Sequence, residues 1–190
     1  MISHLMILAV LAGPAQLPEA TKPVSYYPLK VGNTWHYKLG DKKASTKVTA
    51  LEKIGDLMTA RIETIIDGNV VANENIAETA DGIVRVAVNG QKADKPVLLL
   101  KLPPNKGDSW DINTKIAGET VKGKFTVSEE EVQVPAGKFK AVTSSGDFQL
   151  NGEPARFGYW FAPDVGIVKV SMVAMDVDLT WELQKFDAAK

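Results

Sequence analysis

Hydrophobic and polar residues alternate one by one along most of the chain after residue 26. In residues 34–39, Trp35, Tyr37 and Leu39 fall on one face and polar residues on the other. Residues 175–183 repeat the pattern, with hydrophobic side chains at every odd position and Asp, Thr or Glu between them. This period of two is typical of strands that bury one face and expose the other. Because no helical period longer than about ten residues is present, the pattern predicts an all-β protein.

Dipeptides that favour tight turns separate these alternating runs. Asn-Gly and Asp-Gly supply the positive φ angles that two-residue hairpin turns require. Strands spaced about 8 to 14 residues apart by such turns make an antiparallel meander, here of about ten to twelve strands. We expect this meander to form a curved half-barrel or a two-layer sheet. The predicted turns lie at Gly55-Asp56, Asp67-Gly68, Asp81-Gly82, Asn89-Gly90 and Asn151-Gly152.

One connection is irregular and divides the pattern into two halves. Pro103 and Pro104 follow an apolar run and stop strand pairing, so we predict a joint between two parts of the sheet there. The sequence "LKVGNTW" at 29–35 is echoed by "PNKGDSW" at 104–110. Turn chemistry also repeats by chance in a β-rich chain. Since the match covers few residues, we favour coincidence over an internal repeat.

Composition narrows the possible partners. The chain has 190 residues with 22 Lys plus Arg and 23 Asp plus Glu, and the formal net charge is −1. One domain is expected at this length. Without a basic excess, neither nucleic acid nor an anionic lipid surface is predicted as a partner. The absence of cysteine excludes disulfides, thiolate nucleophiles and cysteine metal sites.

The first residues resemble a secretory signal. An apolar run from Leu5 to Ala12 precedes small residues, and it is too short to span a bilayer, which takes about 20 residues. The stretch before the run lacks Lys and Arg, so an apolar tail or a misplaced start codon is the alternative. We predict a signal peptide at 1–15, a linker at 16–25, a single β domain at 26–190 and no transmembrane segment in the mature chain. The mature protein is then exported, to the periplasm or the extracellular space.

Reactive residues are few. If the signal is removed, His36 is the one remaining histidine, and it alternates with Trp35 and Tyr37 on the solvated face. Asp176 and Asp178 share a face and could chelate calcium or act as an acid–base pair, but a solvated polar face explains them equally. We therefore predict no enzyme activity, no metal site and no cofactor. A carboxylate hydrolase stays as an alternative, and it needs Asp or Glu side chains from different strands in one cleft.

Three segments, "YYPLKVGNTWHYKL", "VQVPAGKFKAV" and "YWFAPDVGIVKV", resemble the signature blocks of a family of exported bacterial β-proteins of unknown function. That family is similar in fold to the curved sheets of the Lol-system lipoprotein carriers. The resemblance implies a fold and a compartment, and brings no catalytic residues. The carriers drape their sheet over helices, whereas no matching long helix is readable here. The VPAG and APDVG stretches contain no nucleophile, base or metal ligand, so we predict hairpin corners at both.

Aromatic residues on the apolar strand faces are the remaining residues that indicate a function. A strongly curved sheet needs something to cover its concave face. Without a helix, the candidates are a second sheet layer, closure into a barrel, a partner or an apolar ligand. We expect a non-catalytic cell-envelope protein that binds an apolar ligand or envelope component there; the alternative is a structural or protein-interaction module without a small-molecule ligand. The predicted ligand-binding residues are Trp35, Tyr37, Trp110, Phe139, Tyr159, Phe161 and Trp181.

Overall fold

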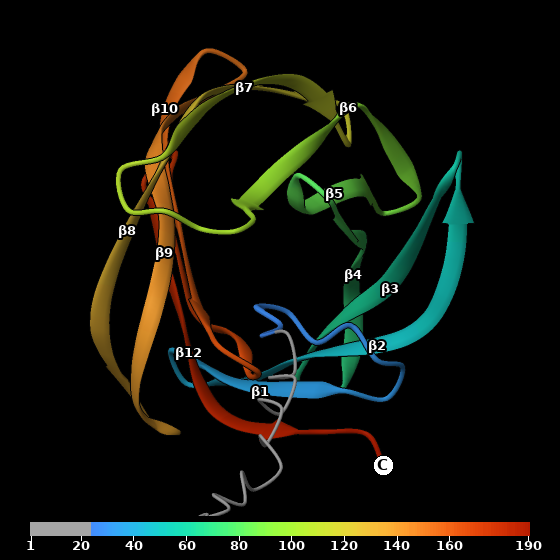
Figure 1. The fold of residues 1–190 in the computed structure, drawn as a ribbon, viewed down its shortest axis with the longest axis vertical. Helices are drawn as coiled ribbons and strands as arrows, with labels where there is room; N and C mark the ends of the chain where they lie inside the picture. Colours follow the sequence, from blue (N-terminus) through green and yellow to red (C-terminus); the bar gives the residue numbers. More distant parts are fainter. Residues whose placement is uncertain (1–23) are drawn as a thin grey trace, which may run out of the picture.

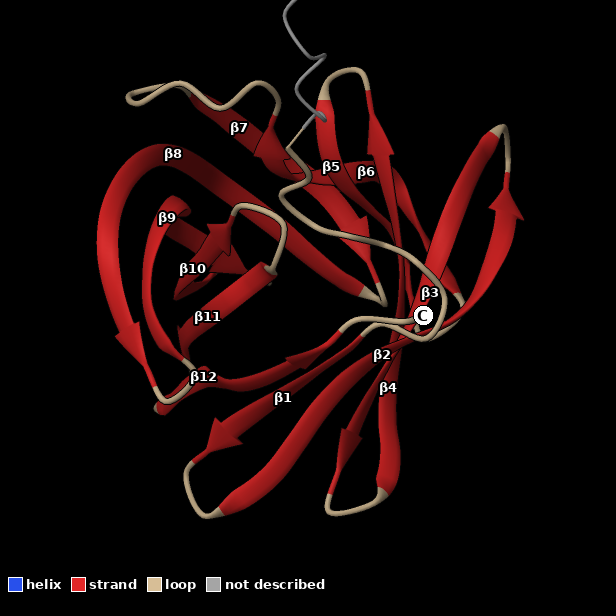
Figure 2. Cartoon of the chain, turned by 60° about the horizontal axis from the view of Figure 1, so that its bottom comes forward, coloured by secondary structure: helices blue, strands red, loops and turns tan. Residues whose placement is uncertain are grey.

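The chain folds into strands joined by turns and loops, as the computed structural model of residues 24–190 shows (Figure 2). The predicted signal peptide and most of the predicted linker lie outside the described residues. No helix in residues 24–190 is long and apolar enough to cross a membrane. The prediction of an all-β fold is confirmed. The strands are β1 (Thr34–Leu39), β2 (Lys42–Ile54), β3 (Leu57–Ile66), β4 (Asn69–Thr79), β5 (Gly82–Val88), β6 (Gln91–Lys101), β7 (Ser109–Ile116), β8 (Glu119–Val134), β9 (Gly137–Leu150), β10 (Glu153–Ala162), β11 (Gly166–Ala174) and β12 (Val177–Asp187).

The twelve strands form one antiparallel sheet that curls into a nearly closed barrel (Figure 1). Strands adjacent in sequence pair with each other within each half, and β1 pairs with β12. The sheet order therefore runs from β6 back to β1, then from β12 back to β7. The predicted meander is confirmed, and it closes further than a half-barrel. Each wall covers the apolar face of the opposite wall, so no helix is needed for that purpose.

Side chains join the two edge strands, β6 and β7. The indole Nε1 of Trp110 donates to the carbonyl oxygen of Leu98 at 3.0 Å. The Thr114 hydroxyl accepts from the backbone N–H of Lys95 and donates to the Lys95 carbonyl oxygen, both at 2.9 Å. We call this contact the seam. The connection from β6 to β7 contains Pro103 and Pro104, so the predicted joint lies at the seam.

The sequence echo corresponds to one local structure built twice. In both copies the same three-bond turn has a Gly with positive φ at its third position, φ being 96° at Gly32 and 91° at Gly107. The echoed residues therefore build the same turn twice, and whether the match is a coincidence or an internal repeat stays a prediction. In the first copy the bonds run from Gly32 N–H to Val48 O (2.9 Å), Val48 N–H to Asn33 O (3.0 Å) and Asn33 N–H to Lys30 O (3.0 Å). In the second they run from Gly107 N–H to Val127 O (2.9 Å), Val127 N–H to Asp108 O (2.8 Å) and Asp108 N–H to Asn105 O (3.0 Å).

Buried side chains of the segment at 24–33 fill one end of the barrel. Tyr27 is buried against Trp35, with ring centroids 5.1 Å apart. The buried Asn33 side chain donates to the Pro28 carbonyl oxygen at 2.6 Å and accepts from the Ala189 N–H at 2.8 Å. These bonds attach both ends of the described chain to the same end of the barrel. We call it the closed end.

The hairpin corners predicted at VPAG and APDVG are confirmed: they join β8 to β9 and β10 to β11. The Ala136 N–H of the VPAG corner donates to the Leu183 carbonyl oxygen of β12 at 2.8 Å.

The alternation at 175–183 predicts an unbroken strand, and this prediction is wrong for the first two residues. Met175 and Asp176 form the turn before β12, both with positive φ. The polar–apolar period continues through a two-residue turn, so the pattern alone hides it.

His36 lies on the outer face, as predicted. Its side chain is 42% exposed, and its Nε2 lies 3.0 Å from the Asp187 carboxylate of the paired strand β12. Within residues 24–190, no three His, Asp or Glu side chains form a cluster that would hold a metal ion.

Candidate functional site

A cavity of about 450 Å³ lies inside the barrel, towards the end opposite the closed end. Its wall includes Ile66, Val88 and Met172, which lie close to the turns that follow β3, β5 and β11. Paired residues of neighbouring antiparallel strands point to the same face, and here the pairs Val170–Trp181 and Met172–Leu179 face inward. We call this cavity the lumen. Its apolar lining includes Val71, Val88, Val170, Met172, Leu179 and Trp181.

A smaller cavity of about 70 Å³ lies beside the lumen, inside the barrel against β6 to β10. It shares Arg85, Phe157 and Tyr159 with the lumen, so these three side chains separate the two spaces. Beside them, aromatic rings of the β7–β10 wall pack on one another. The Phe125 and Phe148 centroids are 4.6 Å apart. The boundary between the two cavities is therefore aromatic, with the polar groups of Arg85 and Tyr159 in it.

These polar groups belong to a cluster of Arg85, Glu74 and Tyr159. Arg85 Nε donates to Glu74 Oε2 at 2.5 Å, and Arg85 Nη1 donates to the Tyr159 hydroxyl at 3.4 Å. The guanidinium carbon also lies 5.9 Å from the centre of the Tyr159 ring. The side chains of Arg85 and Glu74 are only 22% and 20% exposed. The three residues come from β5, β4 and β10, so the cluster connects opposite walls.

The surroundings keep Arg85 charged. Burial by itself would lower the pKa of Arg85, but the Glu74 carboxylate and Tyr159 outweigh burial and raise the pKa above its usual range. A buried pair of this kind gains Coulomb energy at the cost of dehydrating two charges, so it adds little net stability. The pair supplies the charged groups of a largely apolar lumen, whose other polar lining residues outside the cluster are Thr64 and Asn73.

The number of carboxylates in the lumen tests whether it could be the cleft of the alternative, a carboxylate hydrolase. Glu74 is the one carboxylate among the described residues that line the lumen. The pair of acids that a carboxylate hydrolase needs is not assembled there.

The structure brings together only some of the predicted ligand-binding residues. Tyr159 and Trp181 line the lumen. Tyr37 is buried beneath Trp181, edge to face at 5.8 Å, and its hydroxyl donates to the Ile167 carbonyl oxygen at 2.8 Å. The other predicted residues lie elsewhere. Trp35 and Phe161 are fully buried at the closed end, Trp110 lies at the seam, and Phe139 is half-buried just after the VPAG corner.

Sequence reasoning missed Arg85 and Glu74. The signal for Arg85 was present, because the arginine stands alone within the apolar run "IVRVAV" of β5. A charged residue in such a run is expected to have a buried partner. Glu74 gives no such signal, because β4 reads as a polar strand at that point.

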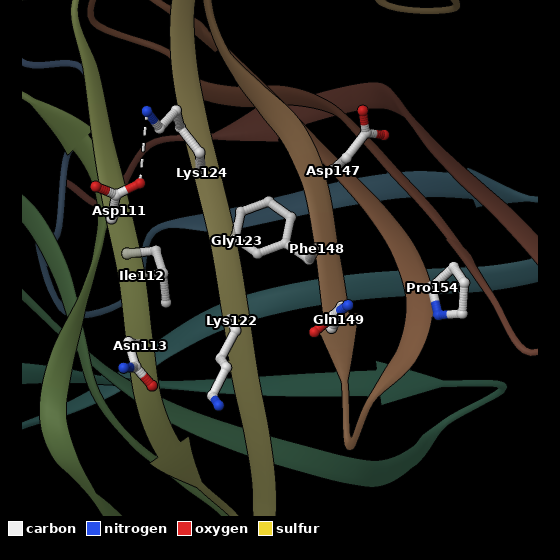
Figure 3. A pocket seen from close by; sticks show the side chains of 10 residues that line it. All are labelled: Asp111, Ile112, Asn113, Lys122, Gly123, Lys124, Asp147, Phe148, Gln149 and Pro154. Carbon is white, nitrogen blue, oxygen red and sulfur yellow. Dashed lines mark ion pairs between the residues drawn. The ribbon is translucent and has the colours of Figure 1, made fainter.

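A larger hollow of about 660 Å³ lies on the outer face of β7 to β10 (Figure 3). Charged side chains border it, including the ion pair of Asp111 and Lys124 at 3.6 Å. These two side chains are 79% and 58% exposed, so water and salt screen them. The hollow has no enclosing walls that would remove a ligand from water. The lumen has such walls, and it is the better candidate site.

The fold and the lumen define a class, an antiparallel β-barrel with a partly open, largely apolar interior. No protein-family model matches the chain, and no curated protein matches it in sequence. Two solved structures share its fold. One, from Bacteroides fragilis, is provisionally described as an exported protein with a YmcC-like fold; it is 13% identical, with a TM-score of 0.51, covering 87% of this chain and 100% of its own.

The second, from Parabacteroides distasonis, is provisionally described as a lipoprotein. It is also 13% identical, with a TM-score of 0.53, covering 88% of this chain and 100% of its own. The expected likeness to exported bacterial β-proteins is thus supported at the level of fold. The three-block family and the likeness to Lol carriers stay predictions.

Proposed function

We propose that this protein is a non-catalytic binding protein of the cell envelope that holds an apolar molecule in the barrel lumen. The observation that carries the proposal is the lumen itself, about 450 Å³ in volume and lined mainly by Val, Leu, Met and aromatic side chains. Small-molecule sites are typically concave, apolar spaces of about 300–1,000 Å³ with a few placed polar groups. The Arg85–Glu74–Tyr159 cluster supplies such groups.

Two further observations support the location in the envelope. The apolar run from Leu5 to Ala12 has the length of a secretory signal core. The two structures with this fold are described as an exported protein and a lipoprotein.

Filling the lumen tests the proposal. Ala72 lines the lumen on β4, so Ala72→Trp places a large ring inside it. Val70 on the same strand is 57% exposed and is not part of the lining, so Val70→Trp adds a similar ring outside. We expect the neutral fluorescent probe N-phenyl-1-naphthylamine to bind the wild type and Val70→Trp equally. Its affinity for Ala72→Trp should fall about tenfold or more, which corresponds to about 1.4 kcal/mol. Equal binding to all three proteins, or no binding to any, would contradict the proposal.

A second candidate function is a protein-interaction module without a small-molecule ligand. Exposed apolar side chains favour it, since Val173, Met175 and Val177 around the β11–β12 turn are 44%, 67% and 45% exposed. Exposed apolar groups of this kind mark contact surfaces when they are contiguous. Replacing all three with Ser should abolish capture of an envelope partner and leave probe binding intact. Lumen binding retained without any partner would favour the first candidate.

A further inference from the structure

We infer that the lumen selects a ligand whose apolar chain ends in an uncharged oxygen-bearing group, such as an alcohol or ester, and that Arg85 receives that oxygen. This inference rests on the proposed function, because it specifies the chemistry of a ligand that the lumen holds. It is carried by the geometry of the polar cluster and by the shape of the two cavities.

Arg85 has hydrogen-bond donors to spare. A guanidinium carries five N–H groups. Among the described residues, Glu74 accepts one of them from Nε and Tyr159 accepts one from Nη1, the latter at the long distance of 3.4 Å. Arg85 lines both the lumen and the smaller cavity, so its remaining donors lie next to ligand-accessible space. A ligand oxygen there would satisfy donors that the protein leaves without acceptors.

The charge of the cluster argues against an anionic ligand. Glu74 already neutralises Arg85 through a 2.5 Å bond, so the cluster has no net charge to offer an anion. A carboxylate at Arg85 would lose its hydration and lie near the Glu74 carboxylate. An uncharged oxygen avoids both costs and still accepts a hydrogen bond from a charged donor, which is stronger than one from a neutral donor.

The position of Arg85 sets the orientation of the ligand. Arg85 lies three residues before Val88, the last residue of β5. At about 3.3 Å per residue it lies about 10 Å along the strand from that end, and so deeper in the barrel. The apolar lining residues Val71, Val88 and Met172 lie nearer the open end. The oxygen therefore lies deep and the chain points outward.

The volume of the lumen sets the size. If each non-hydrogen atom takes about 30 Å³, as a water molecule does in the liquid, the 450 Å³ lumen holds about fifteen such atoms. Dodecanol and methyl dodecanoate are close to that size. Dodecane and dodecanoate have nearly the same chain and differ at the end group, so the four compounds isolate the contribution of the oxygen.

The experiment measures how well these four compounds, delivered from methyl-β-cyclodextrin at neutral pH, displace N-phenyl-1-naphthylamine from the wild-type protein. Dodecanol and methyl dodecanoate should bind about tenfold more tightly than dodecane, the effect expected of one hydrogen bond to a charged group. Dodecanoate should bind more weakly than dodecanol.

Two variants separate charge from hydrogen bonding. Glu74→Gln keeps the shape and leaves Arg85 cationic, so the affinity for dodecanoate relative to that for dodecanol should rise about tenfold or more. The double variant Arg85→Met with Glu74→Gln removes both charges, and its preference for dodecanol over dodecane should fall about tenfold. Glu74→Gln leaves the buried charge of Arg85 unpaired, which destabilises the fold. The double variant contains no unpaired charge at this site, so it tests the inference without that effect.

The outcomes are distinguishable. Tightest binding of dodecanoate by the wild type, or an unchanged alcohol preference in the double variant, would overturn the inference and leave the proposed function standing. If none of the four compounds displaces the probe and the probe itself does not bind, the proposed function fails as well.

Discussion

The turns at 30–35 and 105–110 have the same backbone hydrogen bonds but serve two different joints of the barrel. The first leads into β1, whose backbone pairs with β12 along its length. The second leads into β7, an edge strand that meets β6 through side-chain hydrogen bonds. One local structure thus begins both halves of the sheet, and its surroundings decide how each half is fastened.

The tryptophans that end the two turns show the difference most clearly. Trp35 is fully buried, lies against Phe186 with centroids 5.2 Å apart, and donates to the Val165 carbonyl oxygen at 2.6 Å. Trp110 is only half-buried and donates to the Leu98 carbonyl oxygen. The first tryptophan anchors the closed end, and the second holds the seam. We therefore expect the barrel to open first at the seam.

The largest expected effect comes from truncating the two tryptophans. Trp35→Ala should lower the free energy of unfolding by about 3–5 kcal/mol, the usual cost of removing a buried Trp. Trp110→Ala removes less buried surface and should cost about 2 kcal/mol. Urea denaturation measures both values. Equal losses would show that the two joints contribute alike.

The seam itself is tested by Thr114→Val, which keeps the shape and removes the hydroxyl. The N–H and carbonyl oxygen of Lys95 then lose their partner, at a cost of about 1–3 kcal/mol. Hydrogen exchange should accelerate at the Lys95 amide and leave the β1–β12 amides unchanged. Thr126→Val at an exposed position of β8 is the matched control, and exchange that rises equally in both variants would disprove the role of the seam.

The two turn glycines give a smaller and more closely matched comparison. Ala at Gly32 or Gly107 has to adopt a positive φ, which costs about 1–2 kcal/mol at either position. A Cβ at Gly32 would also lie 3.1 Å from the Ala189 Cβ, whereas a Cβ at Gly107 meets no heavy atom within 4 Å. Gly32→Ala should therefore be the more destabilising in thermal melts. Adding Ala189→Gly should remove the difference, and a difference that persists would contradict the contact.

The smallest effect is a pH dependence at the β1–β12 joint. Hydrogen bonds from Lys185 and then His36 hold the pKa of Asp187 below its usual value. Its stabilising contribution is therefore present above the usual carboxyl pKa of about 3.9 and is lost as pH falls through the lowered pKa. Asp187→Asn should melt slightly below wild type at about pH 6, and the gap should close as pH falls through the lowered pKa. A gap that stays constant with pH would refute this.

Local patterns predicted the strands and most turns because a period of two and Asn-Gly or Asp-Gly pairs act over a few residues. Local patterns could not predict whether each aromatic side chain packs in the core or lines the lumen. Trp35 and Trp181 occupy equivalent alternating positions in their strands, yet one fills the closed end and the other lines the lumen. The difference depends on how far the sheet closes. The pairing of Arg85 with Glu74 likewise depends on a bulge in the β4–β5 register, between Asn75 and Ile76, which the sequence does not reveal.

The most direct test of the lumen as a ligand site is a crystal structure of the protein with 12-bromododecanol, using the anomalous signal of bromine. We expect the hydroxyl at Arg85 and the bromine near Val71 and Met172, at the open end of the lumen. Bromine in the outer hollow of Figure 3, or bromine beside Arg85 with the hydroxyl outside, would contradict the account.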